Sequence, residues 1–200
     1  MTDKLARVKL ARAAAALNAR SGSALPALVL MTDDERLIDP VAAARALPPR
    51  SMVILRARQD SRRAELASEL RSALSADTKL LIANDADLAA HTGADGIHLS
   101  EARAHEASHW RAAHPGWIIT AAAHSRAATH ISAVDAVFVG PVFETRSHPG
   151  TVALGATQLD LIARQSPVPV YAIGGITADN AQQLADAKLV GLAAIGALTV

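Results

Sequence analysis

Residues Pro169 to Asn180, PVYAIGGITADN, contain the most informative local pattern in the sequence for predicting the fold. Its apolar run, Val170 to Ile173, is too short for a stable helix and is typical of a fully buried strand. Glycines such as Gly174 and Gly175 adopt backbone angles closed to other residues and let an anion approach bare N–H groups. Thr177 is the candidate N-cap of a helix behind them. This strand–turn–helix order predicts a phosphate-sized cradle, and a tight turn without a ligand is the alternative.

The same order of short apolar run, turn and helix recurs along the chain. The predicted strands are 27–31, 52–56, 80–83, 97–99, 118–123, 136–139, 170–173 and 192–195. Short apolar runs that alternate with helices are typical of a parallel sheet, and eight strands close a (β/α)8 barrel. An open doubly wound sheet is the alternative, but the chain has no dinucleotide-binding fingerprint. In the barrel, phosphate lies near the loops after strands seven and eight, where the glycine pair falls.

A helix is expected before the first strand, from Asp3 to Asn18, with apolar positions that include Leu5, Val8 and Leu17. After the last predicted strand, Gly196 to Val200 are too few for the helix that covers the eighth strand of a regular barrel. We therefore predict that the first helix packs beside strands one and eight in place of the missing one. The alternative is that another subunit covers strand eight.

Composition limits the class of protein. The chain has 200 residues, of which 50% are hydrophobic, enough for one substantial core. We expect a single domain over 1–200, with the first helix in 1–20 and the barrel in 27–198. The absence of cysteine excludes disulfides and thiolate metal sites and suits a cytoplasmic protein. A net charge of +1 and the lack of a long apolar run predict neither a nucleic-acid nor a membrane partner.

Seven sequence blocks, in order and spacing, resemble the thiamine phosphate synthase superfamily, which also contains the TenI-type thiazole tautomerases. The blocks are TDD at 32–34, LRAR at 55–58, IANDADLA at 82–89, GADGIHL at 93–99, AAHS at 122–125, VGPVFET at 139–145 and AIGGITADN at 172–180. The resemblance covers about residues 27–198. It implies a (β/α)8 barrel that binds a phosphorylated thiazole. The substrate- and phosphate-binding positions that it implies are Arg56, Arg58, Asn84, Thr145, His148, Gly174, Gly175 and Gly196.

The synthase reaction expels pyrophosphate from an aminopyrimidine, which calls for Mg²⁺ on carboxylates and for cations that take the departing charge. The resemblance implies that Asp85 is a first Mg²⁺ ligand. The positions that match the second carboxylate hold Ala102 and Arg103. Glu101 is a neighbour in sequence, and whether it replaces the missing ligand stays open.

Further positions depart from the synthase pattern. Ala57 lies between the cations Arg56 and Arg58, where the synthase pattern has a carboxylate. His148 occupies the position of the expected lysine. Two positions where the pattern has a hydroxyl side chain hold Ala122 and Gly196 instead. Together these departures predict that binding of pyrophosphate and Mg²⁺ is weakened or absent.

The tautomerase reaction is a 1,3-proton shift, for which one side chain that exchanges a proton near neutral pH is sufficient. His124, at the end of strand five, matches the catalytic histidine of the tautomerases. A histidine that packs at a strand end and bonds a backbone carbonyl is the alternative. The tautomerase needs no cofactor, whereas a synthase needs Mg²⁺.

Several other charged or polar residues have structural interpretations. Arg56 and Arg58 face the same side of a strand and either bind an anion or pair with Asp33 or Asp85. His98 is interpreted as structural. His105, His109 and His114 are interpreted as an exposed helix surface and not as a metal site.

The sequence therefore predicts a thiazole tautomerase-like isomerase of thiamine biosynthesis with a small phosphorylated thiazole as substrate. Thiamine phosphate synthase is the alternative reaction. A non-catalytic module that binds thiazole or thiamine phosphate is the alternative from another class. The oligomeric state stays open.

Overall fold

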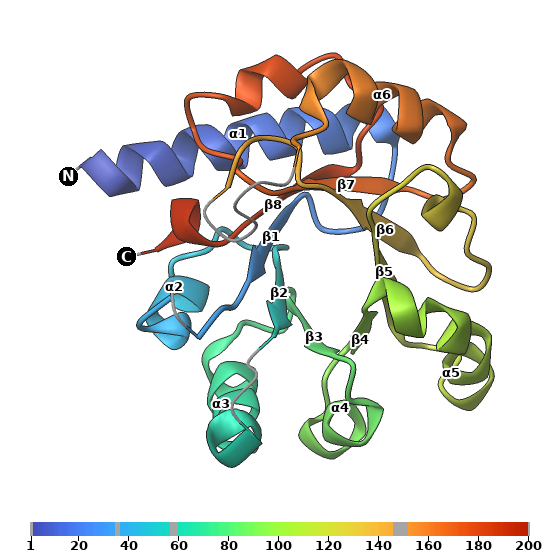
Figure 1. Cartoon of the computed structure of the whole chain (residues 1–200). Coiled ribbons are helices and arrows are strands. Elements are labelled where there is room, and N and C mark those ends of the chain that lie inside the picture. The colour runs from blue at the N-terminus through green and yellow to red at the C-terminus, as the bar shows by residue number, and fades with distance from the viewer. Residues whose placement is uncertain (1, 35–36, 57–59, 146–151, 200) are drawn as a thin grey trace.

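Eight parallel strands form a closed barrel in the computed structural model of the chain (Figure 1). The structure describes residues 2–34, 37–56, 60–145 and 152–199. The strands are β1 (Leu28–Met31), β2 (Met52–Leu55), β3 (Lys79–Ala83), β4 (Gly96–Leu99), β5 (Ile118–Ala123), β6 (Ala136–Val139), β7 (Val170–Ile173) and β8 (Gly191–Ala194). Pairing of β1 with β8 closes the ring. The predicted barrel is confirmed, and the open sheet is excluded.

Helices cover the outside of the barrel. The α-helices are α1 (Thr2–Ser21), α2 (Pro40–Arg45), α3 (Asp60–Ala73), α4 (Ala86–Thr92), α5 (Ala107–Ala113) and α6 (Gly155–Gln165). The short 3-10 helices are η1 (Glu101–Glu106), η2 (Ala127–Thr129), η3 (Ala181–Leu184) and η4 (Gly196–Leu198). In the described part of the chain, none of the helices has the length and apolar character needed to cross a membrane.

Two predicted helices differ in type from the observed ones. The helix predicted from about Ala102 to Ala113 begins as the 3-10 helix η1 and becomes α-helical only at Ala107. The helix predicted behind Thr177 is only the four-residue η3. Because η3 is so short, the helix dipole contributes little to the phosphate cradle that was predicted there.

The core has an inner and an outer layer. Alternate residues along each strand point to opposite faces, so Val29 and Met31 lie inside the barrel while Leu28 and Leu30 face the helices. The inner layer is closed by Phe138, which stacks on the only tyrosine of the chain, Tyr171, with ring centroids 4.6 Å apart.

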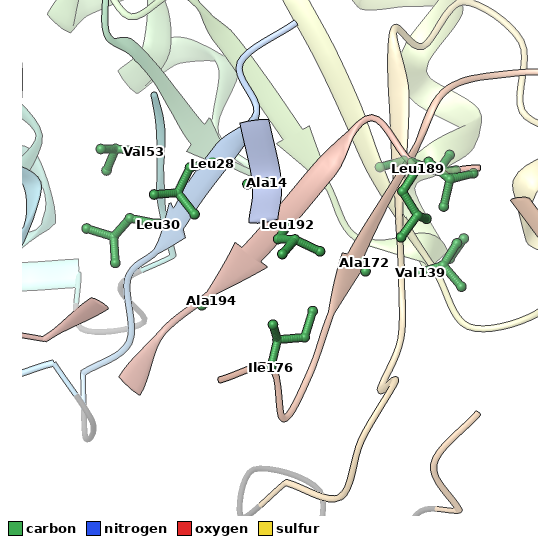
Figure 2. Packing of buried hydrophobic residues seen from close by; sticks show 14 of the residues in the cluster. Ala14, Leu28, Leu30, Val53, Val139, Ala172, Ile176, Leu189, Leu192 and Ala194 are labelled. Atoms are coloured by element: carbon green, nitrogen blue, oxygen red, sulfur yellow. The ribbon is translucent and has the colours of Figure 1, made fainter. Parts of the chain in front are cut away.

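Helix α1 packs beside β1 and β8, as predicted (Figure 1). Leu10, Ala14 and Leu17 make the contact and are at most 2% exposed. Figure 2 labels Ala14 in one layer with residues of β1 and β8. The prediction that Leu5 and Val8 cover the strand is wrong, because these side chains are 58% and 41% exposed. At 100° per residue they fall on the opposite face of the helix.

Polar contacts hold α1 in this place. The side-chain amide of Asn18 donates to the carbonyl oxygens of Leu25 and Val190, at 2.9 and 3.0 Å. Near the other end of the helix, Arg7 donates to the carbonyl oxygen of Thr199 at 2.9 Å. These bonds join α1 to segments that flank both β1 and β8.

Two aspartates form hydrogen bonds between neighbouring segments at the amino-terminal end of the barrel. Asp95, which precedes β4, accepts hydrogen bonds from the backbone N–H of Leu80 and from Arg71, at 2.9 and 3.0 Å. Asp135, which precedes β6, accepts from the backbone N–H of Ile119 and from Arg111, at 2.7 and 2.6 Å. Each aspartate thus binds the preceding strand and an arginine of the α-helix before that strand. This end of the barrel is structural and leaves the opposite end for a ligand.

Candidate functional site

A cavity of about 800 Å³ opens at the carboxyl ends of the strands, and we call it the mouth cavity. This is the end at which barrel enzymes carry their chemistry. The predicted site residues that line it are Arg56, Asn84, His124, Thr145, Gly174, Gly175 and Gly196. Arg58 and His148 lie outside the described residues. The fold therefore brings together most of the residues that the sequence singled out, although they are spread over 140 positions of sequence, from 56 to 196.

The turn after β7 requires both of its glycines. Gly174 and Gly175 have φ angles of 97° and 67°, which side chains rarely adopt. A Cβ atom at Gly174 would lie 2.6 Å from the Cα of Pro141, and one at Gly175 would lie 2.5 Å from the carbonyl oxygen of Glu144. The loop after β6 therefore packs directly against this turn.

The carbonyl groups of the same turn are occupied by protein donors. Ile173 and Gly174 accept hydrogen bonds from the backbone N–H groups of Val142 and Phe143, both at 3.0 Å. Gly175 accepts from the side-chain amide of Asn180 at 2.8 Å. The carbonyl oxygens of this turn therefore face protein donors. Such an arrangement suits the wall of a cavity that receives an anion.

Thr177 and Asn180 brace the turn reciprocally. The backbone N–H of Thr177 donates to the side-chain oxygen of Asn180 at 2.8 Å, and the backbone N–H of Asn180 lies 3.3 Å from Oγ1 of Thr177. The prediction that Thr177 is the N-cap of a helix is wrong, because Asn180 is the residue that precedes η3, and Thr177 braces the turn before it. On the other side, Gly196 begins η4 directly after β8 and lines the cavity beside the glycine turn.

Arginine side chains enter the mouth cavity from β2 and α3. Arg56 makes the ion pair with Asp33 that the sequence analysis considered, at 2.8 Å. Arg63 on α3 also lines the cavity and donates to the carbonyl oxygen of Ala83. In the described part of the chain, the Nε atoms of both arginines are buried without a hydrogen-bond partner. Arg63 was missed because its place within a surface helix carries no signal in a single sequence.

Asn84 holds the connection between β3 and β4. Its backbone has a φ of 56°, and its side-chain oxygen accepts from the backbone N–H of Ser100 at 2.7 Å. The carbonyl oxygen of Asn84 accepts from Arg103 at 2.5 Å. Asn84 is therefore a structural link at the edge of the cavity as well as a candidate ligand contact.

The surroundings of Asp85 do not fit the divalent metal site that the family resemblance implies. One oxygen of Asp85 caps α4 by accepting from the backbone N–H of Leu88 at 2.9 Å. The other lies 4.0 Å from Nε of Arg63. The described residues contain no cluster of three carboxylate, histidine or cysteine side chains that could hold a metal.

Arg103 is a further reason for the misfit. It pairs with Glu106 through two bonds of 2.7 and 2.8 Å. The pKa of Arg103 is raised, first by the hydrogen bonds that it donates to Glu106 and also by the charges of Glu106 and Asp85. A guanidinium thus stands near Asp85 where the resemblance implies a second carboxylate. Glu101, the neighbouring carboxylate in sequence, is bound through Oε2 to His124.

Glu101 and His124 form a pair at the rim of the cavity. Oε2 of Glu101 lies 2.8 Å from Nδ1 of His124 and accepts from its backbone N–H at 2.6 Å. Because a carboxylate only accepts, Nδ1 carries a proton and Nε2 is free to exchange one. His124 thus has a carboxylate partner, and among the described residues its ring has no backbone carbonyl partner.

His98 lies deeper in the same cavity. It is 5% exposed and lines the cavity wall, with Nδ1 2.9 Å from Oγ1 of Thr120. Burial lowers its pKa to about 3, and the positive charge of Arg56 acts in the same direction. The prediction that His98 is only structural therefore misses its place in the site. Its strand-end position was the available signal.

The three histidines on and after η1 and α5 are not gathered into a metal site. His105 and His109 are exposed, as predicted. His114 is partly buried and stacks on Trp117, with centroids 3.6 Å apart.

A family model described as thiamine monophosphate synthase matches residues 28–198. A thiamine-phosphate synthase of Nostoc sp. is 34% identical over 140 residues, which are 68% of this chain and 40% of that protein. A thiamine-phosphate synthase of Coprothermobacter proteolyticus is 34% identical over 123 residues, which are 60% of this chain and 58% of that protein. The chain thus matches less than two thirds of the length of these relatives.

A solved structure shows the same fold. The thiamine phosphate pyrophosphorylase from Pyrococcus furiosus superposes with a TM-score of 0.67 and covers 84% of each chain, at 24% sequence identity. This likeness supports the barrel architecture alone.

Proposed function

Because the chain belongs to the thiamine monophosphate synthase family, we propose that it is an enzyme of thiamine biosynthesis that binds a phosphorylated thiazole in its mouth cavity. The observation that carries this proposal is the turn at Gly174 and Gly175. Its φ angles and close contacts admit only glycine, and its carbonyl groups are taken by protein donors. A phosphate at this turn, beside Gly196, directs the rest of the ligand across the cavity.

The relatives favour condensation as the first candidate reaction, because those compared above are named thiamine-phosphate synthases. In this reaction the thiazole nitrogen forms a bond to the methylene carbon of an aminopyrimidine diphosphate. The carbon–oxygen bond to the diphosphate breaks, and its electron pair leaves on pyrophosphate. Arg56 and Arg63 are the described cations that line the cavity and could receive this charge.

The residues near Asp85 weaken the case for condensation. Mg²⁺, when bound, would neutralise the departing pyrophosphate, but Asp85 lies near Arg63 and Arg103 and caps α4. In addition, Arg56 and Arg103 are already paired with carboxylates, Asp33 and Glu106.

The pair of Glu101 and His124 favours a proton shift as the second candidate reaction. Nε2 of His124 takes a proton from one atom of the thiazole tautomer and returns it to another, so that the ring becomes aromatic with no net loss of atoms. Glu101 holds Nδ1–H and stabilises the imidazolium that forms between the two steps. The rim position of His124 suits exchange with a ligand in the cavity.

A binding and turnover experiment separates these possibilities. Isothermal titration of the purified protein with thiazole phosphate tests the common substrate site. Separate assays then follow condensation with aminopyrimidine pyrophosphate, with and without Mg²⁺, and aromatisation of the thiazole tautomer. Turnover in one assay identifies the reaction. Binding without turnover in either assay identifies a non-catalytic thiazole-binding module, and absence of binding contradicts the proposed site.

The cellular location remains a prediction from sequence, and the oligomeric state stays open, with a homo-oligomer as one alternative. We expect a cytoplasmic protein that has a small phosphorylated substrate and no nucleic-acid partner. Cell fractionation tests the location, and analytical ultracentrifugation determines the oligomeric state.

A further inference from the structure

His98 is a polar side chain within a largely apolar part of the mouth cavity. It belongs to β4, which lies opposite β8 in the closed ring of eight strands. The edge of its ring meets Phe138, with centroids 5.0 Å apart and planes at 81°. Met31 and Ala193 line the cavity from β1 and β8. A ligand that extends from Gly196 across the mouth therefore approaches His98 with the end that does not carry its phosphate.

The hydrogen bond to Thr120 determines which nitrogen of His98 carries the proton. Thr120 lies beside His98 on the neighbouring strand and is 0% exposed. Within the described residues, its hydroxyl has no other hydrogen-bond partner than Nδ1 of His98. A buried hydroxyl donates its proton where an acceptor is available. Nδ1 is therefore the acceptor, and Nε2 carries the proton.

Nε2 of His98 is left for a ligand. In the described part of the chain this atom has no hydrogen bond. The buried polar side-chain atoms that lack a hydrogen bond there are Nε of Arg56 and Nε of Arg63, so Nε2 of His98 is not fully buried. Nε2 is therefore open to the cavity that His98 lines.

We propose that His98 is a positioning residue whose Nε2–H donates a hydrogen bond to an acceptor atom of the ligand ring. The ligand class is a phosphorylated heteroaromatic compound with an unprotonated ring nitrogen or an oxygen substituent, a description that rests on the proposed function. Its phosphate lies at Gly174 and Gly175, and its ring lies over Phe138. Thr120 acts through His98, since it keeps the proton on Nε2.

The charge state of His98 agrees with this role. Burial and the neighbouring Arg56 lower its pKa to about 3, so the ring stays neutral at physiological pH. A neutral imidazole can donate a hydrogen bond to a substrate without transferring its proton. His98 is thus distinct from His124, whose free nitrogen lies at the rim.

The tautomer can be tested without a ligand. Long-range ¹H–¹⁵N correlation spectra of the full chain should show His98 protonated on Nε2 and unchanged from pH 5 to pH 9. Replacement Thr120→Val keeps the shape of the side chain but removes the donor, so the preference for Nε2–H should disappear. A proton on Nδ1 in the unsubstituted protein, or titration of His98 within this range, overturns the proposal.

The contact with the ligand is tested by titration with thiazole phosphate. His98→Met removes the donor and should weaken binding about tenfold, the effect of one hydrogen bond. His98→Gln places an amide donor near the position of Nε2 and should recover part of the loss. Both variants should bind inorganic phosphate as the unsubstituted protein does, because the phosphate site is elsewhere. Thermal unfolding confirms that each variant is folded.

The outcomes separate this inference from the proposed function. If the unsubstituted protein does not bind thiazole phosphate, the proposed function fails and the ligand contact fails with it. If the unsubstituted protein binds and His98→Met binds equally well, only the role of His98 is overturned. If His98→Met does not fold, the tautomer measured on the unsubstituted protein still decides the donor state.

Discussion

The Oε2 atom of Glu101 lies 2.8 Å from Nδ1 of His124 and 2.6 Å from the backbone nitrogen of the same residue. One carboxylate oxygen thus holds both the ring and the start of the loop after β5. The side chains are 40% and 61% exposed, so the pair is accessible from the cavity and from solvent. Such a pair orients an imidazole and supports proton exchange at its other nitrogen.

Replacement His124→Gln tests the proton-transfer role. Tautomerisation should fall by roughly 10²-fold or more, the low end for a general acid–base residue, whereas binding of thiazole phosphate should stay close to normal. Glu101→Gln should lower the rate less, because the amide still accepts from Nδ1–H but no longer stabilises the imidazolium. Steady-state kinetics and isothermal titration measure both quantities. Equal activity of His124→Gln would return this histidine to a structural role.

Replacement Arg103→Asp tests the metal prediction. We expect that the unsubstituted protein does not bind Mn²⁺ at Asp85, because Arg63 and Arg103 provide the cations there. Arg103→Asp removes one cation and adds a carboxylate, so it should create a Mn²⁺ site that electron paramagnetic resonance detects. Arg103→Ala removes the cation only and is the control. Stoichiometric Mn²⁺ binding by the unsubstituted protein would contradict the prediction, as would robust Mg²⁺-dependent condensation.

Replacement Gly175→Ala tests the phosphate cradle. The new Cβ atom would lie 2.5 Å from the carbonyl oxygen of Glu144, at a φ of 67°. The turn must therefore shift, and affinity for thiazole phosphate should fall at least about tenfold, since a contact with a charged group contributes about 1.5–3 kcal/mol. Gly116→Ala is the matched control, because nothing lies within 4 Å of its Cβ position. Unchanged affinity of Gly175→Ala would place the phosphate elsewhere.

Replacement Leu10→Ala tests the structural role of α1. Leu10 is 0% exposed against the barrel, so its loss should lower the free energy of unfolding by about 2–5 kcal/mol. Leu5→Ala, on the 58% exposed face, should change it by less than about 0.5 kcal/mol. Chemical unfolding measures both, and deletion of residues 1–20 should remove most of the stability. Similar effects of the two substitutions would show that α1 does not cover β8 in solution.

The pH dependence of stability should report the burial of His98. Its pKa is lowered from 6.5 to about 3 in the folded protein, so below pH 6.5 the unfolded chain binds a proton that the folded chain does not. The contribution of His98 to the free energy of unfolding is therefore fully present above pH 6.5 and is lost as the pH falls toward 3. The slope is at most about 1.4 kcal/mol per pH unit. Urea unfolding should show a weaker pH dependence for His98→Gln, and identical slopes would contradict a neutral buried His98.

The barrel and the end at which its candidate site lies can be predicted from sequence alone. Short apolar runs and the turns after them are local properties, and each strand lies within one residue of its predicted bounds at either end. Because parallel strands align their carboxyl ends at one edge of a sheet, residues that end different strands, such as His124, Gly174 and Gly196, were expected to meet. They do line one cavity.

Tertiary packing determines which side chains meet there and which face of a helix is buried. Arg63 reaches the cavity from α3, Glu101 turns toward His124, and Arg103 stands near Asp85. These relationships depend on the rotation of each helix about its axis and on the strand register. In α1, alanine and leucine occur on several faces, so periodicity did not distinguish the buried face of Leu10 from the exposed face of Leu5. Packing against β8 determines which face of α1 is buried, because a neighbouring element removes only one face of a helix from water.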